Sequence, residues 1–285
     1  MNKVYLNGEF VVASEAKISP MDRGFLFGDG IYEVIPTYSG KPVGLLLHLQ
    51  RMKSGLHSVG INYDIDTEVW TDIINKLISQ QSSESQGVYV HVSRGKDVKR
   101  FHAYPKNVTP TVFAYAFDIP ASQNTTNEKV RGFHVTTGQD LRWQRCHIKS
   151  TSLLGNVMHF QQGQDAGADE IILYNENKEI TEAAACNVFI VKNNIIYTPP
   201  LDNHLLPGIT RRIAIDAIKQ HTDYKMLECK IYLDDLLNAD EVWITSSSKE
   251  IGPVFSIDGK PVGNGNTGTT WIAAQNAYNK YKFNC

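Results

Sequence analysis

The chain has 285 residues, of which 42% are hydrophobic and 20% charged, a composition typical of globular proteins and unlike that of disordered chains. Lysine and arginine total 28 against 30 for aspartate and glutamate, so the net charge of −2 gives no field that would attract nucleic acid or an anionic membrane. No apolar run approaches the roughly 20 residues of a membrane helix, and the N-terminal segment lacks an export signal. We therefore expect a cytoplasmic protein of about two domains.

The first half of the chain mixes strands and helices. Asn7-Gly8 supplies the positive φ angles of a tight hairpin turn, and Ser39-Gly40-Lys41 marks a second hairpin. Apolar residues spaced three and four apart predict two amphipathic helices further on. The expected strands are 4–6, 10–12, 31–38, 42–47, 88–93 and 111–117, and the expected helices are 48–59 and 69–78.

A polar, proline-marked stretch at 119–129 predicts a linker between an N-terminal domain, 1–118, and a C-terminal domain, 130–285. In the second domain we expect strands at 130–137, 171–174, 187–192, 195–198, 224–232 and 241–246, with helices at 152–164, 210–220, 234–237 and 270–282. Because strands and helices do not alternate strictly, the pattern favours an α+β fold over a doubly wound sheet.

Several common functional motifs are missing or out of context. Residues 263–268 spell G-x-G-x-x-G, but they follow a hairpin and leave only 17 residues, too few for a dinucleotide-binding unit, so we expect a loop. The four cysteines lie 40 or more residues apart, which is unlike a metal site or a secreted disulfide scaffold. No P-loop, zinc-protease or serine-hydrolase motif occurs, and we expect no metal.

Two stretches of the second domain could bind an anion. Gly208 allows close approach of a ligand, and the N–H groups of Ile209 and Thr210 begin a helix whose dipole suits a phosphate; an ordinary capped helix is the alternative. A cluster of hydroxyls, among them Ser246 and Ser247, follows a predicted strand. By itself, this cluster is a polar strand end.

Two ionisable residues have a second interpretation beside the ordinary one. Lys149 reads as a surface lysine, but a lysine in a pocket can form a Schiff base with an aldehyde. Glu182 lies among small apolar residues and reads as a charge at the start of a strand. If it is buried, it requires a cationic partner, and a pyridinium nitrogen would serve.

Short motifs follow one another along almost the whole chain. They are Asp22-Arg23-Gly24-Phe25-Leu26-Phe27-Gly28-Asp29-Gly30-Ile31-Tyr32-Glu33-Val34, His48-Leu49-Gln50-Arg51-Met52, Arg94-Gly95, Arg100-Phe101-His102, Asp140-Leu141-Arg142-Trp143, Lys149-Ser150, Thr181-Glu182, Asn187-Val188-Phe189, Gly208-Ile209-Thr210-Arg211, Ser246-Ser247 and Glu250-Ile251. As a set they resemble the class IV aminotransferases, which are pyridoxal phosphate enzymes of fold type IV, and most closely the D-amino-acid transaminases. The resemblance implies two α+β domains with the cofactor at their interface.

The resemblance also implies how the cofactor, pyridoxal 5′-phosphate, is held. Lys149 would carry it as an internal aldimine and act as the catalytic base, which would place the Schiff-base lysine in the C-terminal domain, and Glu182 would pair with the ring nitrogen. Arg51 would bind the phosphate. The backbone of Ile209 and Thr210, the hydroxyls of Ser246 and Ser247, and Leu206 beside the ring would complete the site.

The implied reaction moves an amino group between a D-amino acid of the D-alanine type and a 2-oxo acid of the 2-oxoglutarate type. Tyr32, Arg100 and His102 would bind the substrate carboxylate, and since Arg100 and His102 reach the neighbouring subunit in this family, a homodimer is implied. The alternative for these two residues is a solvated basic loop.

Two related reactions stay open. Aminodeoxychorismate lyases, which release 4-aminobenzoate and pyruvate, share the cofactor residues but typically have two threonines where this chain has Glu33-Val34. Branched-chain aminotransferases usually carry Tyr-x-Arg where this chain has Tyr89-Val90-His91. The segment 183–186 departs from the serine-rich segment of the D-amino-acid transaminases, and His48 has no role here beyond positioning.

Overall fold

The computed structural model describes residues 3–125 and 130–285, which divide into two compact units. The first comprises residues up to Ala121 together with Ile148–Leu153, and the second comprises the described residues of Ser122–His147 and Leu154–Cys285. The predicted linker, 119–129, includes this change of unit, and its residues 126–129 lie outside the described residues.

Lys149 is grouped with the first unit, whereas its place in the sequence had put it in the second. Ile31 forms a β-bridge with Ser150, and the Tyr32 N–H donates to the Lys149 carbonyl at 3.1 Å. These backbone contacts attach the lysine segment to a strand that lies more than 100 residues earlier.

The first unit contains a six-stranded antiparallel sheet in the order β2-β1-β6-β5-β3-β4 among the described residues. The predicted hairpin at Asn7-Gly8 is confirmed, with φ angles of 49° and 102° at the turn. The strands are β1 (Lys3–Leu6), β2 (Glu9–Val12), β3 (Gly30–Tyr38), β4 (Lys41–Pro42), β5 (Ser85–Ser93) and β6 (Thr111–Asp118). The helices are η1 (Ala13–Glu15), α1 (Arg23–Phe27), α2 (Leu45–Ser58) and α3 (Thr67–Ile78).

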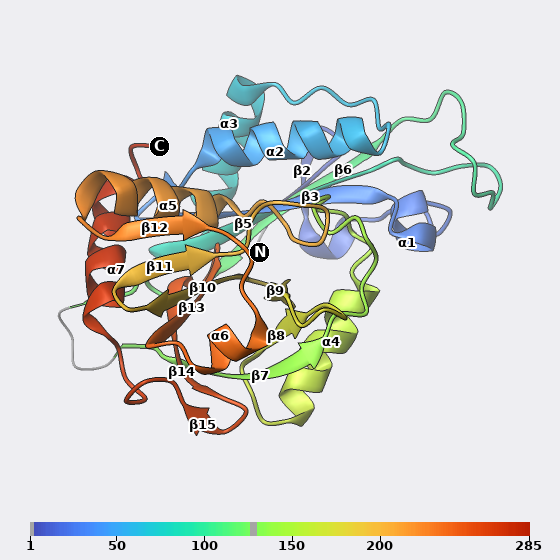
Figure 1. The fold of residues 1–285 in the computed structure, drawn as a ribbon. Coiled ribbons are helices and arrows are strands. Elements are labelled where there is room, and N and C mark those ends of the chain that lie inside the picture. The colour runs from blue at the N-terminus through green and yellow to red at the C-terminus, as the bar shows by residue number, and fades with distance from the viewer. Residues whose placement is uncertain (1–2, 126–129) are drawn as a thin grey trace. The chain divides into compact units, whose positions relative to one another are not determined.

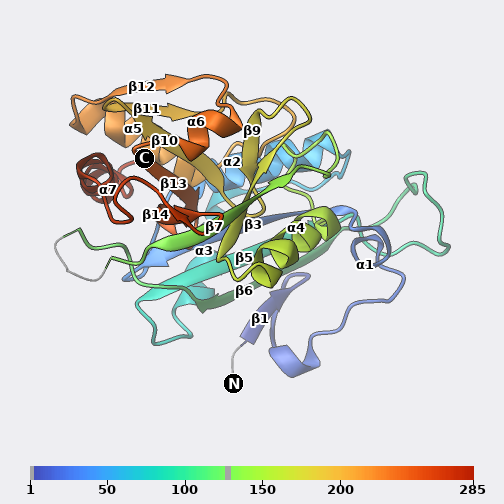
Figure 2. The ribbon, with the colours of Figure 1, turned by 60° about the horizontal axis from the view of Figure 1, so that its bottom comes forward.

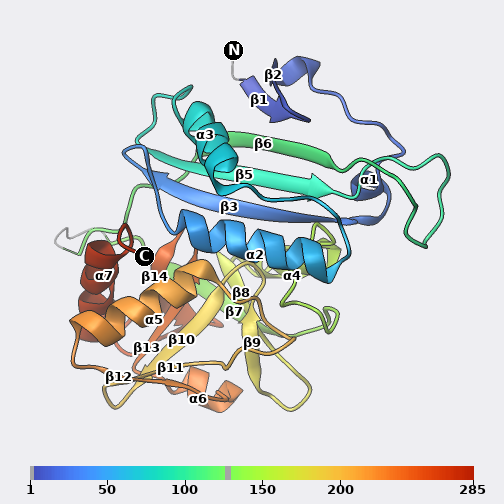
Figure 3. The same cartoon turned by 90° about the horizontal axis from the view of Figure 1, so that it is seen from above.

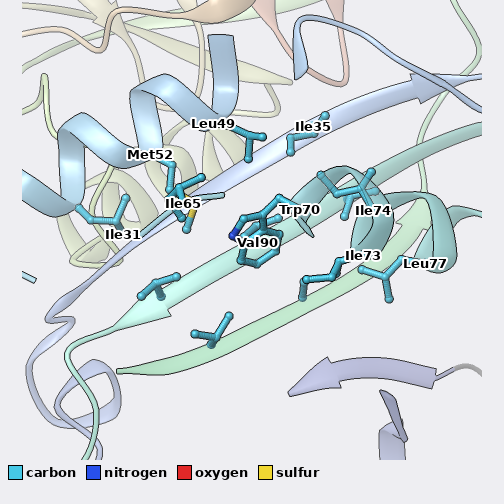
Figure 4. Packing of buried hydrophobic residues seen from close by; sticks show 14 of the residues in the cluster. Ile31, Ile35, Leu49, Met52, Ile65, Trp70, Ile73, Ile74, Leu77 and Val90 are labelled. Atoms are coloured by element: carbon cyan, nitrogen blue, oxygen red, sulfur yellow. The ribbon is translucent and has the colours of Figure 1, made fainter. Parts of the chain in front are cut away.

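Helices α2 and α3 cover one face of this sheet (Figure 3). Their apolar sides supply Met52 and Trp70, which pack against Ile31, Ile35 and Val90 of the strands, all at most 1% exposed (Figure 4). The two predicted amphipathic helices are thus confirmed, and their regularly spaced apolar residues form the side that faces the core.

The predicted strand 42–47 is wrong beyond Pro42. Gly44 adopts the left-handed conformation, with φ at 61°, and turns the chain directly into α2, which begins at Leu45. The apolar run 45–47 therefore belongs to a helix that faces the core on one side. A short apolar run does not distinguish a strand from the first turn of a buried helix.

The second unit contains a nine-stranded sheet of the described residues in the order β12-β11-β10-β13-β14-β7-β8-β9, with β15 paired to β14. Parallel and antiparallel pairs are mixed, which confirms the α+β class. The strands are β7 (Phe133–Gln139), β8 (Glu170–Tyr174), β9 (Ile180–Ala183), β10 (Asn187–Lys192), β11 (Ile195–Thr198), β12 (Lys225–Glu228), β13 (Glu241–Ser246), β14 (Glu250–Ile257) and β15 (Lys260–Pro261). The helices are α4 (Leu154–Asp165), α5 (Ile209–His221), α6 (Leu233–Leu237) and α7 (Thr269–Tyr281).

Helix α4 lies along β7 and β8, whereas α5 and α7 lie against each other (Figures 1 and 2). Strands β9 and β14 and helix α1 are not among the elements predicted from the sequence. The predicted strand 224–232 is wrong after Glu228, where the chain leaves the sheet and leads into α6. The glycine-rich segment 263–268 is a loop between β15 and α7, as predicted. None of the helices in residues 3–125 and 130–285 has the length and apolarity needed to cross a membrane.

Candidate active site

The side chain of Lys149 lies above an aromatic ring in the first unit. Its Nζ is 4.2 Å from the centre of the Tyr32 ring, and the backbone of the same two residues is hydrogen bonded. Tyr32 in turn stacks on Tyr89, with ring centres 5.7 Å apart. Within the described residues the amine has neither a hydrogen-bond partner nor an ion-pair partner. Among the residues that the structure describes, no carboxylate therefore neutralises this amine.

Arg51 belongs to a buried ionic cluster of the first unit. Its Nε and Nη2 each donate to the carboxylate of Glu33 at 2.7 Å, and His48 Nδ1 lies 2.7 Å from the same carboxylate. Burial alone would raise the pKa of Glu33, but Arg51 and His48 outweigh it and lower the pKa to about 2. Burial also lowers the pKa of His48, against the opposing effect of Glu33. Glu33 is therefore ionised at neutral pH and fixes the orientation of the Arg51 guanidinium.

The connection among these three residues was not predicted from the sequence. His48 and Arg51 are three positions apart and so lie on one side of α2, a spacing that is visible in the sequence. Glu33 lies on β3 with the same inward orientation as Ile31 and Ile35, both of which are fully buried. A charged residue in phase with core residues was the available signal, because such a group needs an opposite charge.

Arg100 and His102 lie in the exposed connection between β5 and β6. The Arg100 guanidinium carbon is 5.0 Å from the centre of the Phe27 ring, and the His102 ring centre is 5.4 Å from the same ring. One aromatic side chain thus brings together the two residues expected to bind a carboxylate. Tyr32, the third residue of that expected group, lies on β3.

Glu182, in the second unit, is 5% exposed and lies on β9. Its Oε1 accepts a hydrogen bond from Arg142 Nη1 at 2.6 Å, and its Oε2 accepts from the Leu206 N–H at 3.1 Å. Burial raises the pKa of Glu182, and the Arg142 cation opposes part of that rise. Arg142 is shared with Asp140, which it contacts through Nε and Nη2. The expected need of Glu182 for a cation is thus met by an arginine of the chain itself.

Asn187 connects Glu182 to the start of α5. Its Nδ2 donates to the Leu206 carbonyl at 2.8 Å and lies 3.3 Å from Glu182 Oε2. A Cβ at Gly208 would lie only 2.0 Å from Asn187 Oδ1, so only glycine fits beside this amide. Gly208 is the N-cap residue of α5, and it has no side chain that could accept a hydrogen bond from the N–H groups of the first turn.

The N–H groups of Ile209 and Thr210 are in the first turn of α5 and have no acceptor within the helix. Thr210 lies inside this turn and is 5% exposed, and Gly208 occupies the N-cap position. The positive end of the helix dipole therefore remains available to an anion.

The hydroxyl cluster lies at the end of β13. Ser246 ends this strand and Ser247 begins the turn into β14, and both are half-buried. Thr245, which is 2% exposed and pairs in register with Asn187, has a hydroxyl without a partner among the described residues. Cross-strand partners share one face of a sheet, so this hydroxyl lies beside the side chain of Asn187, which contacts Gly208 at the start of α5. A buried polar atom without a partner in the protein suits a site that a ligand completes.

The predicted site residues therefore form two groups. Tyr32, Arg51, Arg100, His102 and Lys149 lie in the first unit. Glu182, Leu206, Ile209, Thr210, Ser246 and Ser247 lie in the second. Within the second group, Glu182 and Leu206 are in direct contact, and Asn187 connects both to the residue before Ile209.

Comparisons with known proteins identify relatives over nearly the whole length. The chain is 36% identical to the D-alanine aminotransferase of Staphylococcus haemolyticus over 99% of this chain and 98% of that protein. It is 39% identical to the D-alanine aminotransferase of Bacillus licheniformis over 93% of this chain and 92% of the relative. Identity at this level over full length indicates common descent of the whole molecule.

Solved structures share the fold. The branched-chain amino acid aminotransferase of Escherichia coli superposes with a TM-score of 0.88 at 24% identity, covering 99% of this chain and 95% of that one. That of Thermoproteus uzoniensis superposes with a TM-score of 0.85 at 22% identity, covering 99% and 95%. The model of the amino-transferase class IV family matches residues 30–257. The chain thus belongs to the class IV aminotransferases, a family of enzymes that depend on pyridoxal phosphate.

Proposed function

We propose that this enzyme transfers an amino group between a D-amino acid of the D-alanine type and a 2-oxo acid of the 2-oxoglutarate type, with pyridoxal 5′-phosphate as cofactor. Full-length identity of 36–39% with D-alanine aminotransferases supports the substrate class. The observation that carries the chemistry is the Lys149 amine, held over the Tyr32 ring without an opposing carboxylate in the described chain.

The residues present fit this cofactor. A lysine amine suits its aldehyde, a buried carboxylate at Glu182 suits its ring nitrogen, and the first turn of α5 suits its phosphate. The unpartnered Thr245 hydroxyl supports a ligand at the α5 end of this group. When bound, pyridoxal phosphate supplies an aldehyde for covalent attachment and a ring that withdraws electrons from the substrate α-carbon.

The chain's own residues would do the remaining work. Lys149 Nζ would remove the proton from the substrate α-carbon once its amine has been released. Glu182, oriented by Arg142 and the Leu206 N–H, would hold the ring nitrogen protonated. Arg51, oriented by Glu33, would bind the phosphate together with the α5 backbone, Ser246 and Ser247. Leu206 would pack beside the ring.

Substrate binding would depend on a second copy of the chain. We propose that Tyr32 meets the substrate carboxylate together with Arg100 and His102 of a neighbouring subunit, in a homodimer. The exposure of both side chains and their common contact with Phe27 support this arrangement. A guanidinium beside an imidazole is a suitable pair for a carboxylate.

The test is an absorbance spectrum of the purified protein supplied with pyridoxal phosphate. We expect a visible band that disappears on addition of D-alanine and returns with 2-oxoglutarate, while L-leucine leaves it unchanged. Lys149→Ala should abolish the band. Lys178→Ala is the matched control, because Lys178 also lies over a tyrosine ring, 4.3 Å from the centre of Tyr174, but is exposed in the second unit.

Two outcomes would replace the proposal. Formation of 4-aminobenzoate and pyruvate from aminodeoxychorismate, with the band indifferent to D-alanine, would identify a lyase. Conversion of the band by L-leucine in place of D-alanine would identify a branched-chain aminotransferase. If Lys149→Ala kept a covalent cofactor, the assignment of the lysine would be wrong.

A further inference from the structure

The connection between β5 and β6, residues 94–110, extends from the same end of the first unit's sheet as α1 (Figure 3). Arg100 and His102 lie in it, and both side chains are exposed. An exposed basic segment of this length ordinarily has many conformations, because few contacts offset its conformational entropy. The contacts that hold the backbone of this segment therefore decide where its two functional side chains lie.

Arg23, on α1, holds that backbone from a buried position. It is 3% exposed, and its Nη1 donates to the Phe101 carbonyl at 2.5 Å while its Nη2 donates to the His102 carbonyl at 3.2 Å. Its Nε donates to Asp29 at 2.8 Å. The planar guanidinium thus connects the Asp29 carboxylate to two successive backbone carbonyls. These carbonyls belong to the segment that is expected to bind the substrate.

Phe27, one turn further along α1, organises the side chains of the same segment. The Arg23 guanidinium lies 4.8 Å from the centre of its ring, and the Arg100 guanidinium lies 5.0 Å from it. The His102 ring centre is 5.4 Å away. The ring therefore contacts both functional side chains, and cation–π attraction limits the rotamers of Arg100.

A second arginine anchors the start of the connection. Arg94 donates to Asp29 through Nε and Nη2, at 2.8 and 3.0 Å, and lies 3.7 Å from the centre of the Tyr104 ring. Burial acts to raise the pKa of Asp29, but the two guanidinium groups outweigh it and hold that pKa below its ordinary value. Two buried arginines share the single carboxylate of Asp29, which cannot accept hydrogen bonds from all of their N–H groups. The carbonyl oxygens of Phe101 and His102 accept hydrogen bonds from the remaining N–H groups of Arg23.

We propose that Arg23 and Phe27 are positioning residues for substrate binding: they fix the backbone and the rotamers of residues 100–102, so that Arg100 and His102 are presented together to a substrate carboxylate. This inference rests on the proposed function. Neither residue contacts the substrate in this scheme. Each acts through the orientation of the residues that do.

The consequence is a change in substrate affinity without a change in the chemical step. Loss of either contact lets the segment sample conformations that cannot bind the carboxylate. If the competent conformation fell to about a tenth of the population, the apparent affinity would fall about tenfold. Saturating substrate restores that population, so kcat stays close to its original value while KM rises.

The experiment compares Arg23→Lys, Phe27→Leu and Phe25→Leu in the enzyme loaded with pyridoxal phosphate. Lysine keeps the charge beside Asp29 but cannot reach two carbonyls as well, and leucine keeps apolar bulk but has no aromatic face. Phe25 is the matched control, because it lies on the same helix and is 71% exposed. We expect KM for D-alanine to rise about tenfold in the first two variants and to stay unchanged in the third.

Limited trypsin digestion supplies a readout that is independent of activity. Lys99 is an exposed cleavage site in the segment, so Arg23→Lys and Phe27→Leu should be cut there faster than the wild type and Phe25→Leu. The cofactor spectrum and the thermal midpoint of Phe27→Leu should match those of the wild type. A wild-type KM and a wild-type cleavage rate in both variants would overturn the inference.

Arg100→Ala separates this inference from the proposed function. If it raises KM whereas Arg23→Lys and Phe27→Leu do not, the positioning roles are wrong and the proposed substrate site stands. If Arg100→Ala leaves KM unchanged, the proposed carboxylate site itself is wrong, and the effect inferred for Arg23 and Phe27 falls with it.

Discussion

Glu33 is a buried residue whose pKa the fold lowers although burial alone would raise it. Its carboxylate is fully buried and accepts from both Arg51 and His48. The pKa of this carboxyl is lowered from the ordinary 4.5 to about 2. The stability that the carboxylate contributes is therefore complete above pH 4.5 and is lost as the pH falls from 4.5 to 2. His48 acts in the same direction, since its lowered pKa makes acid favour the unfolded chain.

We predict that Glu33→Gln lowers the free energy of unfolding at pH 7 by about 3 kcal/mol, because it removes the buried carboxylate that pairs with the largely buried Arg51 cation. Denaturant titrations of both proteins measure this difference, which should narrow as the pH is lowered from 4.5 towards 2. Asp64→Asn is the control, since the Asp64–Lys53 pair is exposed and its loss should have no measurable effect. An equally small effect for Glu33→Gln would contradict the assigned coupling.

Single residues with unusual chemistry could be predicted from the sequence, but their partners could not. Lys149 and Glu182 could be singled out because a nucleophilic amine and an acid among apolar neighbours are unusual in themselves. The partners of Glu182 could not be, because Arg142 lies 40 positions away and Asn187 meets Leu206 across 19. Contacts between distant positions depend on strand order, which the pattern of a single sequence does not contain.

Among the elements, the start of α5 is closely packed at its first residues. Gly208 is in contact with Asn187, which also bonds the Leu206 carbonyl. The spacing of Gly208 and the apolar face of the helix made this start predictable to within one residue. The close approach of Asn187 was not predictable, because it joins two positions that are distant in the sequence.

We predict that Gly208→Ala destabilises the protein by about 1–3 kcal/mol and weakens cofactor binding, since the new methyl group must displace the Asn187 amide. Equilibrium dialysis with pyridoxal phosphate and denaturant unfolding test both effects. The control is Gly163→Ala within α4, where a Cβ meets its nearest neighbour at an ordinary 3.4 Å. Cofactor binding equal to that of the wild type would show that the Asn187 contact is not part of the phosphate site.

Most helices and strands could be predicted because their apolar periodicity is regular, as in α3 and β10. Two of the failures have an identifiable local cause. The run 45–47 is helical because Gly44 turns the chain, and β9 was missed because Thr181 and Glu182 interrupt an apolar pattern while being buried by partners. Local propensity is overridden where a glycine turn or a buried polar contact decides the path of the chain.

At the scale of the whole molecule, the proposed homodimer makes a prediction about mixed subunits. The Lys149→Ala chain should be inactive alone, and the Arg100→Ala chain should have little activity at D-alanine concentrations well below its raised KM. If the active site takes its lysine from one subunit and Arg100 from the other, a mixed dimer contains one complete site. Random assembly in equal amounts should then restore about a quarter of wild-type activity. Differently tagged chains, refolded together and assayed with D-alanine, provide the measurement.

Subunits that each carry a whole site would give no recovery on mixing, and that result would exclude a shared site. Mixing Lys149→Ala with Glu182→Gln is the matched comparison. If Lys149 and Glu182 serve the same site from the same subunit, neither site of that mixed dimer is complete.

The placement of Ile148–Leu153 in the first unit also bears on how the protein is made. The chain leaves this unit after Ala121 and returns for these six residues only after Ser122–His147 have been synthesised. A nascent chain synthesised as far as Ala121 therefore contains strands β1 to β6 but not Lys149. Domains generally fold as they emerge from the ribosome. Lys149 is thus synthesised after all six strands of the first unit's sheet, including β3, to which its own segment is hydrogen bonded.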